Sequence, residues 1–249
     1  MDDAADKSRA DLVERLKFFR EIGAEMIFTS ELRPRPKPQG SPATPAAGPR
    51  PDATAEYDAL QREILVCRKC PLAAGRTRAV PGEGNLAAEL MFVGEGPGHD
   101  EDVQGRPFVG RAGQMLTKII AAMTFDRADV FITNIVKCRP PGNRVPSPEE
   151  AAACWNYLIR QLQIIRPKVI VTLGNPATQN LLNTTVGITR LRGQWQRLPI
   201  IAEGLEGTPV MPTFHPAFLL RQYSQDNRQK VWDDLRKVMD LLGLKARNR

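Results

Sequence analysis

Four cysteines are spaced in a way that suits the ligation of a metal or a cluster. Two form Cys67-x2-Cys70, and the others are Cys138 and Cys154. Thiolates bind both zinc and iron–sulfur clusters, and four of them complete either kind of site. Zinc ribbons usually present two close knuckles, whereas fifteen residues separate the second pair here. The spacing favours ligation over simple packing and leaves both zinc and [4Fe–4S] open.

Disulfides are the main alternative for these cysteines. The sequence starts with the charged segment Met-Asp-Asp-Ala-Ala-Asp-Lys, without an apolar signal segment. No run reaches the roughly 18 apolar residues of a membrane span. We therefore expect a cytoplasmic protein with no membrane partner, in a reducing compartment where structural disulfides are rare.

Other chemically distinctive residues follow apolar runs that we predict to be strands. The loop Gly-Glu-Gly-Pro-Gly (94–98) follows the first run, Asn134 ends the second, Gly174 follows the third and His215 the fourth. In open α/β sheets, ligands bind at the carboxyl ends of the strands, so these segments should meet in one cleft. The glycine loop lacks the third glycine of a dinucleotide fingerprint, and we expect no helix directly after it. A small-ligand pocket is therefore favoured over a nucleotide cofactor.

Three side chains of this predicted cleft suit the recognition of a flat, polar ring. Asn134 ends an otherwise apolar strand, where a buried amide needs partners, and an amide both donates and accepts as a pyrimidine edge requires. His215 precedes Pro216, which fixes the turn, and a functional role is favoured over a structural one. Phe108 lies among loop residues, where it either joins the core or stacks on a base.

The elements that must position these residues alternate between strands and helices. Strands are predicted at 90–93, 130–133, 169–173 and 209–212, because their apolar residues do not alternate with polar ones, as in buried parallel strands. Helices are predicted at 56–65, 113–123, 148–165, 176–182 and 226–242. Ser147 as N-cap and Glu150 as its capping-box partner mark the start of the third helix. We expect an α/β fold, a three-layer sandwich with a central, mostly parallel four-stranded sheet flanked by helices.

The chain divides into four predicted regions. Residues 1–30 are expected to form an N-terminal helical extension with one apolar face, which offers a surface for a protein partner. Residues 31–54 form a Pro/Ala-rich linker, because so many prolines cannot supply a core. Residues 55–243 form the main domain, and residues 244–249 form a basic tail.

The charge of the chain points to a polyanionic partner. The formal net charge is +7 and the isoelectric point about 9.5. Arg139, Arg144 and Arg221 stand beside the motifs described above, and we predict that they contact phosphates.

Taken together, five motifs resemble the family 4 uracil-DNA glycosylases, the iron–sulfur-containing branch of their superfamily. They are Cys-x2-Cys-Pro-Leu, Gly-Glu-Gly-Pro-Gly, Gly-Arg-Pro-Phe-Val-Gly-Arg-Ala-Gly-Gln, Thr-Asn-Ile-Val-Lys-Cys-Arg-Pro-Pro and Phe-His-Pro-Ala, in order between Cys67 and Arg221. The resemblance implies a base-excision repair hydrolase that flips uracil out of single- or double-stranded DNA and leaves an abasic site. It also implies a monomer associated with the nucleoid, and a [4Fe–4S] cluster on Cys67, Cys70, Cys138 and Cys154.

The resemblance further assigns roles to the residues of the cleft. Phe108 would stack on the extruded uracil, Asn134 would read its O4 and N3 edge, and His215 would donate to O2. Glu95 and Gly96 would contact the base. The better-known branch of the superfamily has a tyrosine and a water-activating aspartate where this chain has Gly98 and Gly96. Glu95 is therefore our candidate for positioning the water.

Three other functions are alternatives to uracil excision. A relative that traps uracil-DNA covalently carries an Arg-rich insertion ending in histidine, which the segment between Cys138 and Cys154 lacks. A non-catalytic DNA-binding protein, stapled by a metal or cluster, explains the cysteines and the charge but not Asn134 and His215. A redox carrier is the third alternative, which the sequence does not test.

Overall fold

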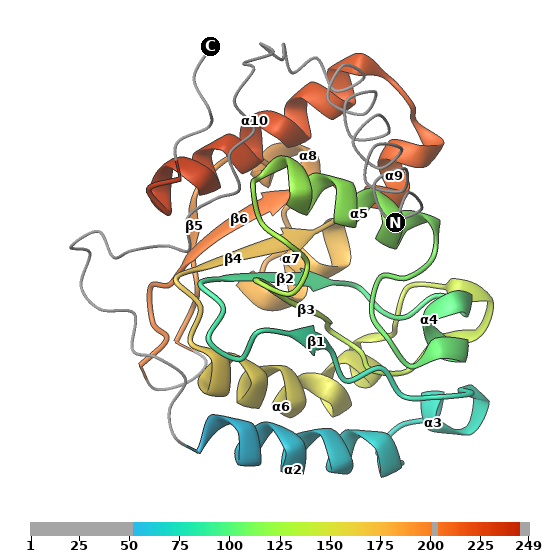
Figure 1. Cartoon of the computed structure of the whole chain (residues 1–249). Helices are drawn as coiled ribbons and strands as arrows, with labels where there is room; N and C mark the ends of the chain where they lie inside the picture. The colour runs from blue at the N-terminus through green and yellow to red at the C-terminus, as the bar shows by residue number, and fades with distance from the viewer. Residues whose placement is uncertain (1–51, 201–203, 245–249) are drawn as a thin grey trace, which may run out of the picture.

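In the computed structural model, which describes residues 52–200 and 204–244, a six-stranded sheet separates two layers of helices (Figure 1). The strand order is β1-β3-β2-β4-β6-β5. The strands are β1 (Glu83–Gly84), β2 (Leu90–Gly94), β3 (Phe131–Asn134), β4 (Val169–Leu173), β5 (Gln196–Arg197) and β6 (Pro209–Thr213). The expected extension at 1–30, the linker up to residue 51 and the tail from residue 245 lie outside the described residues.

The four predicted strands form the parallel centre of the sheet. β3, β2, β4 and β6 pair in parallel, and nearly all of their residues are buried. The sheet is larger than predicted, because β1 and β5 add an antiparallel strand of two residues at each edge. The second predicted strand, at 130–133, is shifted by one residue and forms β3 from Phe131 to Asn134. Ile135 and Val136 still donate to the carbonyls of Gly94 and Glu95, but the chain bends there.

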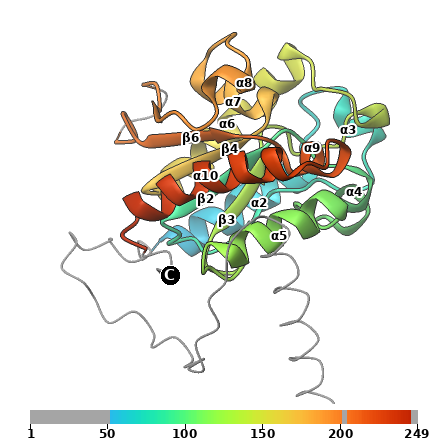
Figure 2. The same ribbon diagram turned by 90° about the horizontal axis from the view of Figure 1, so that it is seen from above.

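The helices cover both faces of the sheet. One apolar cluster joins the sheet to α2 (Ala53–Val66), α6 (Pro148–Ile165) and α7 (Asn175–Leu182), and a second joins it to α5 (Arg111–Ala122), α9 (Pro216–Arg221) and α10 (Gln225–Leu241). Seen from above, α10 lies over the sheet with α5 beside it (Figure 2). Short helices complete the described part: α3 (Leu72–Gly75), α4 (His99–Gln104), α8 (Ile188–Leu191) and a 3-10 turn at Pro141–Asn143. The three-layer α/β architecture is confirmed.

Helix starts follow the local sequence. Glu150 N donates to Ser147 Oγ while the Glu150 carboxylate accepts from Ser147 N, which is the predicted capping box of α6. We predicted no helix directly after the glycine loop, and this was wrong, because α4 begins at His99 with Gly98 as its N-cap. Three acidic residues in the first turn of α4 favour a helix N-terminus there.

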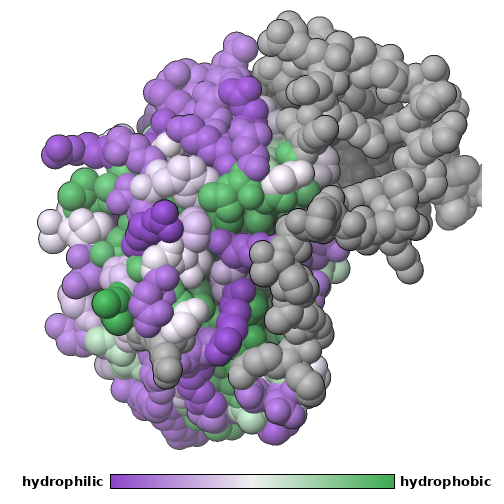
Figure 3. Space-filling model, turned by 90° about the vertical axis from the view of Figure 1, so that its left-hand side faces the viewer, coloured by the Kyte–Doolittle hydropathy of each residue, from purple (hydrophilic) through white to green (hydrophobic). Residues whose placement is uncertain are grey.

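The arrowheads of the parallel strands point to the side of Figure 1 on which α4 and α9 lie. Figure 3 shows the opposite side of the molecule, where polar and apolar residues are interspersed. Within the described residues, none of the helices combines the length and the apolar character needed to cross a bilayer.

Candidate active site

The carboxyl ends of β2 and β3 bring an amide and an aromatic ring together over a glycine. Gly94 and Asn134 are partners in the parallel register. A Cβ atom on Gly94 would lie 2.4 Å from Asn134 Oδ1 and 2.5 Å from Phe108 Cζ. Only a glycine at this position lets both side chains pack against the strand end. Asn134 and Phe108, more than twenty residues apart in sequence, therefore share one site.

The Asn134 side chain has an unused acceptor. Asn134 is 2% exposed, and its Oδ1 is buried without a hydrogen-bond partner among the described residues. A buried carbonyl oxygen without a donor is unfavourable. The site is thus prepared for a ligand that brings an N–H or O–H donor to this oxygen.

His215 follows β6, and its imidazole lies beside the Phe108 ring. Its imidazole centroid lies 5.7 Å from that of Phe108, with an angle of 32° between the rings. The residue is the N-cap of α9, and its Nδ1 accepts from Ala217 N at 3.0 Å. A neutral imidazole that accepts at Nδ1 carries its proton on Nε2. Burial, together with the nearby charge of Arg221, lowers the pKa of His215 to about 4, so the ring is neutral at pH 7.

Glu95 and Gly96 continue the chain from β2 along the edge of this site. Burial raises the pKa of the partly buried Glu95 carboxyl, and Arg221 partly offsets the effect. A Cβ on Gly96 would lie 2.8 Å from Val136 Cγ2, so the backbone approaches the bend after β3 closely. The loop therefore lies against the Asn134 segment, as the strand-end prediction requires.

The three predicted phosphate contacts differ in their surroundings. Arg221 is exposed and close enough to act electrostatically on both Glu95 and His215, so it lies at the site. Arg139 donates to Asn143 Oδ1 at 2.7 Å and lies 3.1 Å from His99 Nδ1. Arg144 instead forms a two-point ion pair with the buried Glu150, which compensates its charge.

The four cysteines gather at one end of the α2 and α6 layer. Cys138 and Cys154 belong to its apolar cluster, with Cys67 and Cys70 packed against it. Burial raises the pKa of the Cys138 thiol, Arg76 opposes this rise, and the nearby Cys70 and Cys67 thiols add to it. Arg76 Nη1 donates to Cys138 Sγ at 2.9 Å, and Lys137 N donates to Cys154 Sγ at 3.3 Å.

The chemistry of these four thiols is compatible with an iron–sulfur cluster, whose usual ligands are cysteine thiolates. Among the described His, Cys, Asp and Glu side chains, no three are close enough to hold one metal ion. A [4Fe–4S] cluster spreads four thiolates over four irons, so its ligands need not converge on one centre. All four cysteines are free thiols in one region, with two donors directed at their sulfurs.

Lys137 joins the thiol region to the backbone carbonyl of Asn134, and it is not among the residues predicted from the sequence. The side chain is 1% exposed, and its Nζ donates to Thr133 Oγ1, Asn134 O and Gln161 Oε1 at 2.6 to 2.7 Å. Burial lowers its pKa to about 8, although the nearby thiols oppose the shift. A lysine inside the apolar run Ile-Val-Lys-Cys was the available signal, because buried lysines need partners.

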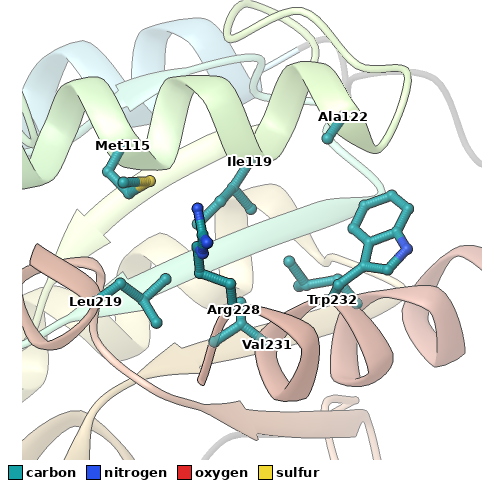
Figure 4. Close-up of a pocket in the computed structure, with 8 residues that line it drawn as sticks. Met115, Ile119, Ala122, Leu219, Arg228, Val231 and Trp232 are labelled. Carbon is teal, nitrogen blue, oxygen red and sulfur yellow. The ribbon is translucent and has the colours of Figure 1, made fainter. Parts of the chain in front are cut away.

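Of the three apolar residues Phe218, Leu219 and Leu220 of α9, two pack against other side chains and one is exposed. Leu219 is 2% exposed and lines a small apolar cavity with Met115 of α5 and Val231 of α10 (Figure 4). None of the residues that line this cavity is a candidate site residue. Phe218 packs against Phe214, with ring centroids 4.5 Å apart. Leu220 is 39% exposed, so its side chain is the one of these three that can contact a bound molecule.

Known proteins of one superfamily are similar to this chain. A profile described as the uracil DNA glycosylase superfamily matches residues 81–236. A type-4 uracil-DNA glycosylase of Thermotoga maritima is 47% identical over 74% of this chain and 93% of its own length. Enzymes of the same description from Archaeoglobus fulgidus and Saccharolobus solfataricus are each 45% identical over 76% of this chain, and over 94% and 87% of their own lengths.

Proposed function

Because this chain belongs to the uracil-DNA glycosylase superfamily and is 47% and 45% identical to two of its type-4 enzymes, we propose that it excises uracil from DNA. The reaction is hydrolysis of the N-glycosidic bond, which releases free uracil and leaves an abasic site for base-excision repair. The observation that carries this proposal is Asn134 Oδ1, which lies beside the rings of Phe108 and His215 without a hydrogen-bond partner in the described part of the chain.

Uracil satisfies the unpaired oxygen, and cytosine does not. Uracil N3–H donates to Asn134 Oδ1, and uracil O4 accepts from the amide nitrogen of the same side chain. Cytosine presents an unprotonated N3 to Oδ1 and an amine to the amide nitrogen, so acceptor faces acceptor and donor faces donor. Phe108 stacks on the face of the base. The pocket thus selects the base by its hydrogen-bonding edge.

His215 stabilises the leaving group. Breaking the glycosidic bond leaves negative charge on the uracil ring, and the Nε2–H of the neutral imidazole donates to O2. The Ala217 N–H fixes the opposite nitrogen, so the donor is oriented before the reaction. A preorganised donor of this kind contributes roughly 3 kcal/mol to transition-state stabilisation. Glu95, whose pKa burial raises, positions the attacking water, and the Gly96 backbone contacts the base.

The base leaves the duplex before it enters this pocket. Extrusion costs a few kcal/mol, and less for a mismatched U·G pair. Arg139 and Arg221 bind phosphates of the flipped strand, and Arg144 contributes less because Glu150 compensates its charge. Leu220 fills the gap that the flipped base leaves, since Leu219 is buried between α5 and α10.

The donor set of Cys67, Cys70, Cys138 and Cys154 suits a [4Fe–4S] cluster, which would serve as a covalent cross-link between distant segments of the fold. Arg76 and the Lys137 backbone donate to two of its ligand sulfurs. We further propose that the protein acts as a monomer, associated with the nucleoid in the cytoplasm. A protein partner for residues 1–30 remains a separate prediction.

One assay tests the proposed function. The purified protein is incubated with a labelled oligonucleotide that contains a single uracil, and alkali then cleaves any abasic site. We expect strand scission at the uracil, with single- and double-stranded substrates compared, and none in oligonucleotides with cytosine at that position. Binding without scission would favour the non-catalytic DNA-binding alternative.

A further inference from the structure

Phe108 adopts a backbone conformation that its side chain does not favour. Its φ is 52°, in the left-handed region that bulky residues rarely occupy. Such a conformation persists only where the surrounding structure determines it. The neighbours of the Phe108 backbone therefore decide where the ring lies.

A carboxylate holds the peptides that follow Phe108. Glu101 Oε1 accepts from the backbone N–H groups of Val109 and Gly110, both at 2.9 Å. The other oxygen, Oε2, accepts from Gly98 N at 3.1 Å. One side chain of α4 thus ties the loop after β2 to the loop that carries Phe108.

A guanidinium holds the peptide that precedes Phe108. Arg127 Nη2 donates to the carbonyl of Pro107, and Arg127 Nε donates to Glu83 Oε1 of β1 at 2.8 Å. The Arg127 side chain is 19% exposed and that of Glu83 22%, so water competes little for this pair. The Phe108 backbone is therefore held from its two sides by opposite charges.

Helix α5 packs against a third side of the Phe108 backbone. A Cβ on Gly113 would lie 1.9 Å from both the carbonyl carbon and the oxygen of Phe108. The helix must present a glycine here, because any side chain would displace the loop. With these three supports, the ring takes its place beside Asn134 and His215.

We propose that Glu101 and Arg127 are positioning residues that act through Phe108, holding its ring where the extruded uracil stacks. This inference rests on the proposed function and adds two residues to it. Neither side chain has to touch the base. Their contribution is to keep the Phe108 ring in a fixed position beside Asn134 in the free enzyme. The base then binds without the entropic cost of ordering the loop that carries Phe108.

Double-mutant cycles test this role. Single-turnover excision rates on a uracil-containing oligonucleotide, and inhibition by free uracil, are measured for Glu101→Gln, Arg127→Gln and Phe108→Ala, alone and combined. We expect each single change at Glu101 or Arg127 to slow excision by about 10- to 100-fold and to weaken inhibition by uracil. In the Phe108→Ala background, the same changes should alter the rate less than about 2-fold.

Matched variants separate positioning from general stability. Arg106→Gln removes a residue that pairs with the same Glu83 but does not bind Pro107 O. Asp102→Asn changes a buried carboxylate of α4 that accepts from Thr77 and Arg78 amides instead of the Phe108 loop. Both are expected to keep uracil inhibition at the wild-type level, whatever their melting temperatures.

The outcomes distinguish this inference from the function on which it rests. Equal losses from Glu101→Gln and Arg127→Gln with and without Phe108 would overturn the positioning role while leaving uracil excision established. An inactive wild-type protein would instead overturn the proposed function. Should Glu101→Gln fail to fold, Arg127→Gln carries the same cycle, and Arg127→Lys, which can still donate to Pro107 O, should restore part of the rate.

Discussion

At the scale of single residues, the proposed role of Asn134 is to decide which base is accepted. Asn134→Asp replaces an amide that donates and accepts with a carboxylate that only accepts. Uracil O4 then faces an acceptor, whereas the cytosine amine finds one. We expect uracil excision to fall and the ratio of cytosine to uracil excision to rise, measured with paired oligonucleotides. Asn183→Asp, on an exposed turn, is the control, and an unchanged ratio at position 134 would count against edge reading.

Substitutions can separate the observed role of His215 as the N-cap of α9 from its proposed role as a donor to uracil. Asparagine is a good N-cap, so His215→Asn keeps the start of α9 but removes the Nε2 donor. We expect single-turnover excision to fall about 100-fold with little change in melting temperature. His215→Ala should lose the cap as well, at a further cost of about 1 kcal/mol in stability.

The pH profile provides a check on the same residue. Because the pKa of His215 is about 4, its imidazole stays neutral from pH 8 down to about pH 5 and contributes no decline in rate there. A loss of activity near pH 6.5 that disappears in His215→Asn would contradict a buried, neutral donor.

At the scale of elements, the thiol region brings together segments far apart in the chain, which the proposed cluster would cross-link. A cluster that joins Cys70 to Cys138 closes a loop of nearly 70 residues, a constraint worth about 4 kcal/mol if the disulfide estimate transfers. We expect Cys138→Ala to lose iron and visible absorbance and to fold poorly. Val66→Ala, at the exposed end of α2, should keep both the iron and the visible absorbance. Full absorbance in Cys138→Ala would rule out this residue as a ligand.

The exposed end of α9 should matter for duplex DNA alone. Leu220→Ala removes the side chain that we expect to fill the vacated base position. Excision from duplex DNA should fall about 10-fold more than excision from single strands, because only the duplex must be opened. Leu241→Ala, which is similarly exposed on α10, should leave both rates unchanged. Equal losses on both substrates would remove the wedge role.

Some elements could be predicted from sequence to the residue, and the reasons are local. β4 is a continuous buried run, and α6 carries a full capping box, so Val169–Leu173 and Pro148–Ile165 match their predictions. β1 and β5 have two residues each, and α4 has six, which is too few for a periodic pattern. α2 begins at Ala53, inside the predicted linker.

Some features of the candidate site could likewise be predicted from the sequence, and others could not. Strand-end residues such as Asn134 and His215 could be placed together because the carboxyl ends of parallel strands share one edge. The contacts that shape the site could not, since they join residues that the sequence does not relate. Gly113 against the Phe108 backbone and Arg127 on Pro107 are contacts of this kind.

At the scale of the whole molecule, the positive charge predicts salt-dependent binding. Each phosphate contact adds about 1 to the slope of log affinity against log salt concentration. Arg221→Gln should lower that slope by about 1, measured by titration of labelled DNA between low and physiological salt. Arg144→Gln should change it less, because Glu150 already compensates that charge. Equal reductions would show that both arginines reach the backbone.

The two edges of the sheet also bear on how the protein behaves at high concentration. An exposed strand edge is a template on which other chains assemble, and short or charged edge strands prevent this. Here each edge is only two residues long, and β1 carries Glu83, whose carboxylate is held by Arg106 and Arg127. The Glu83 carboxylate that pairs with Arg127 therefore also places a charged group on one edge of the sheet, which is a feature that disfavours pairing with another chain.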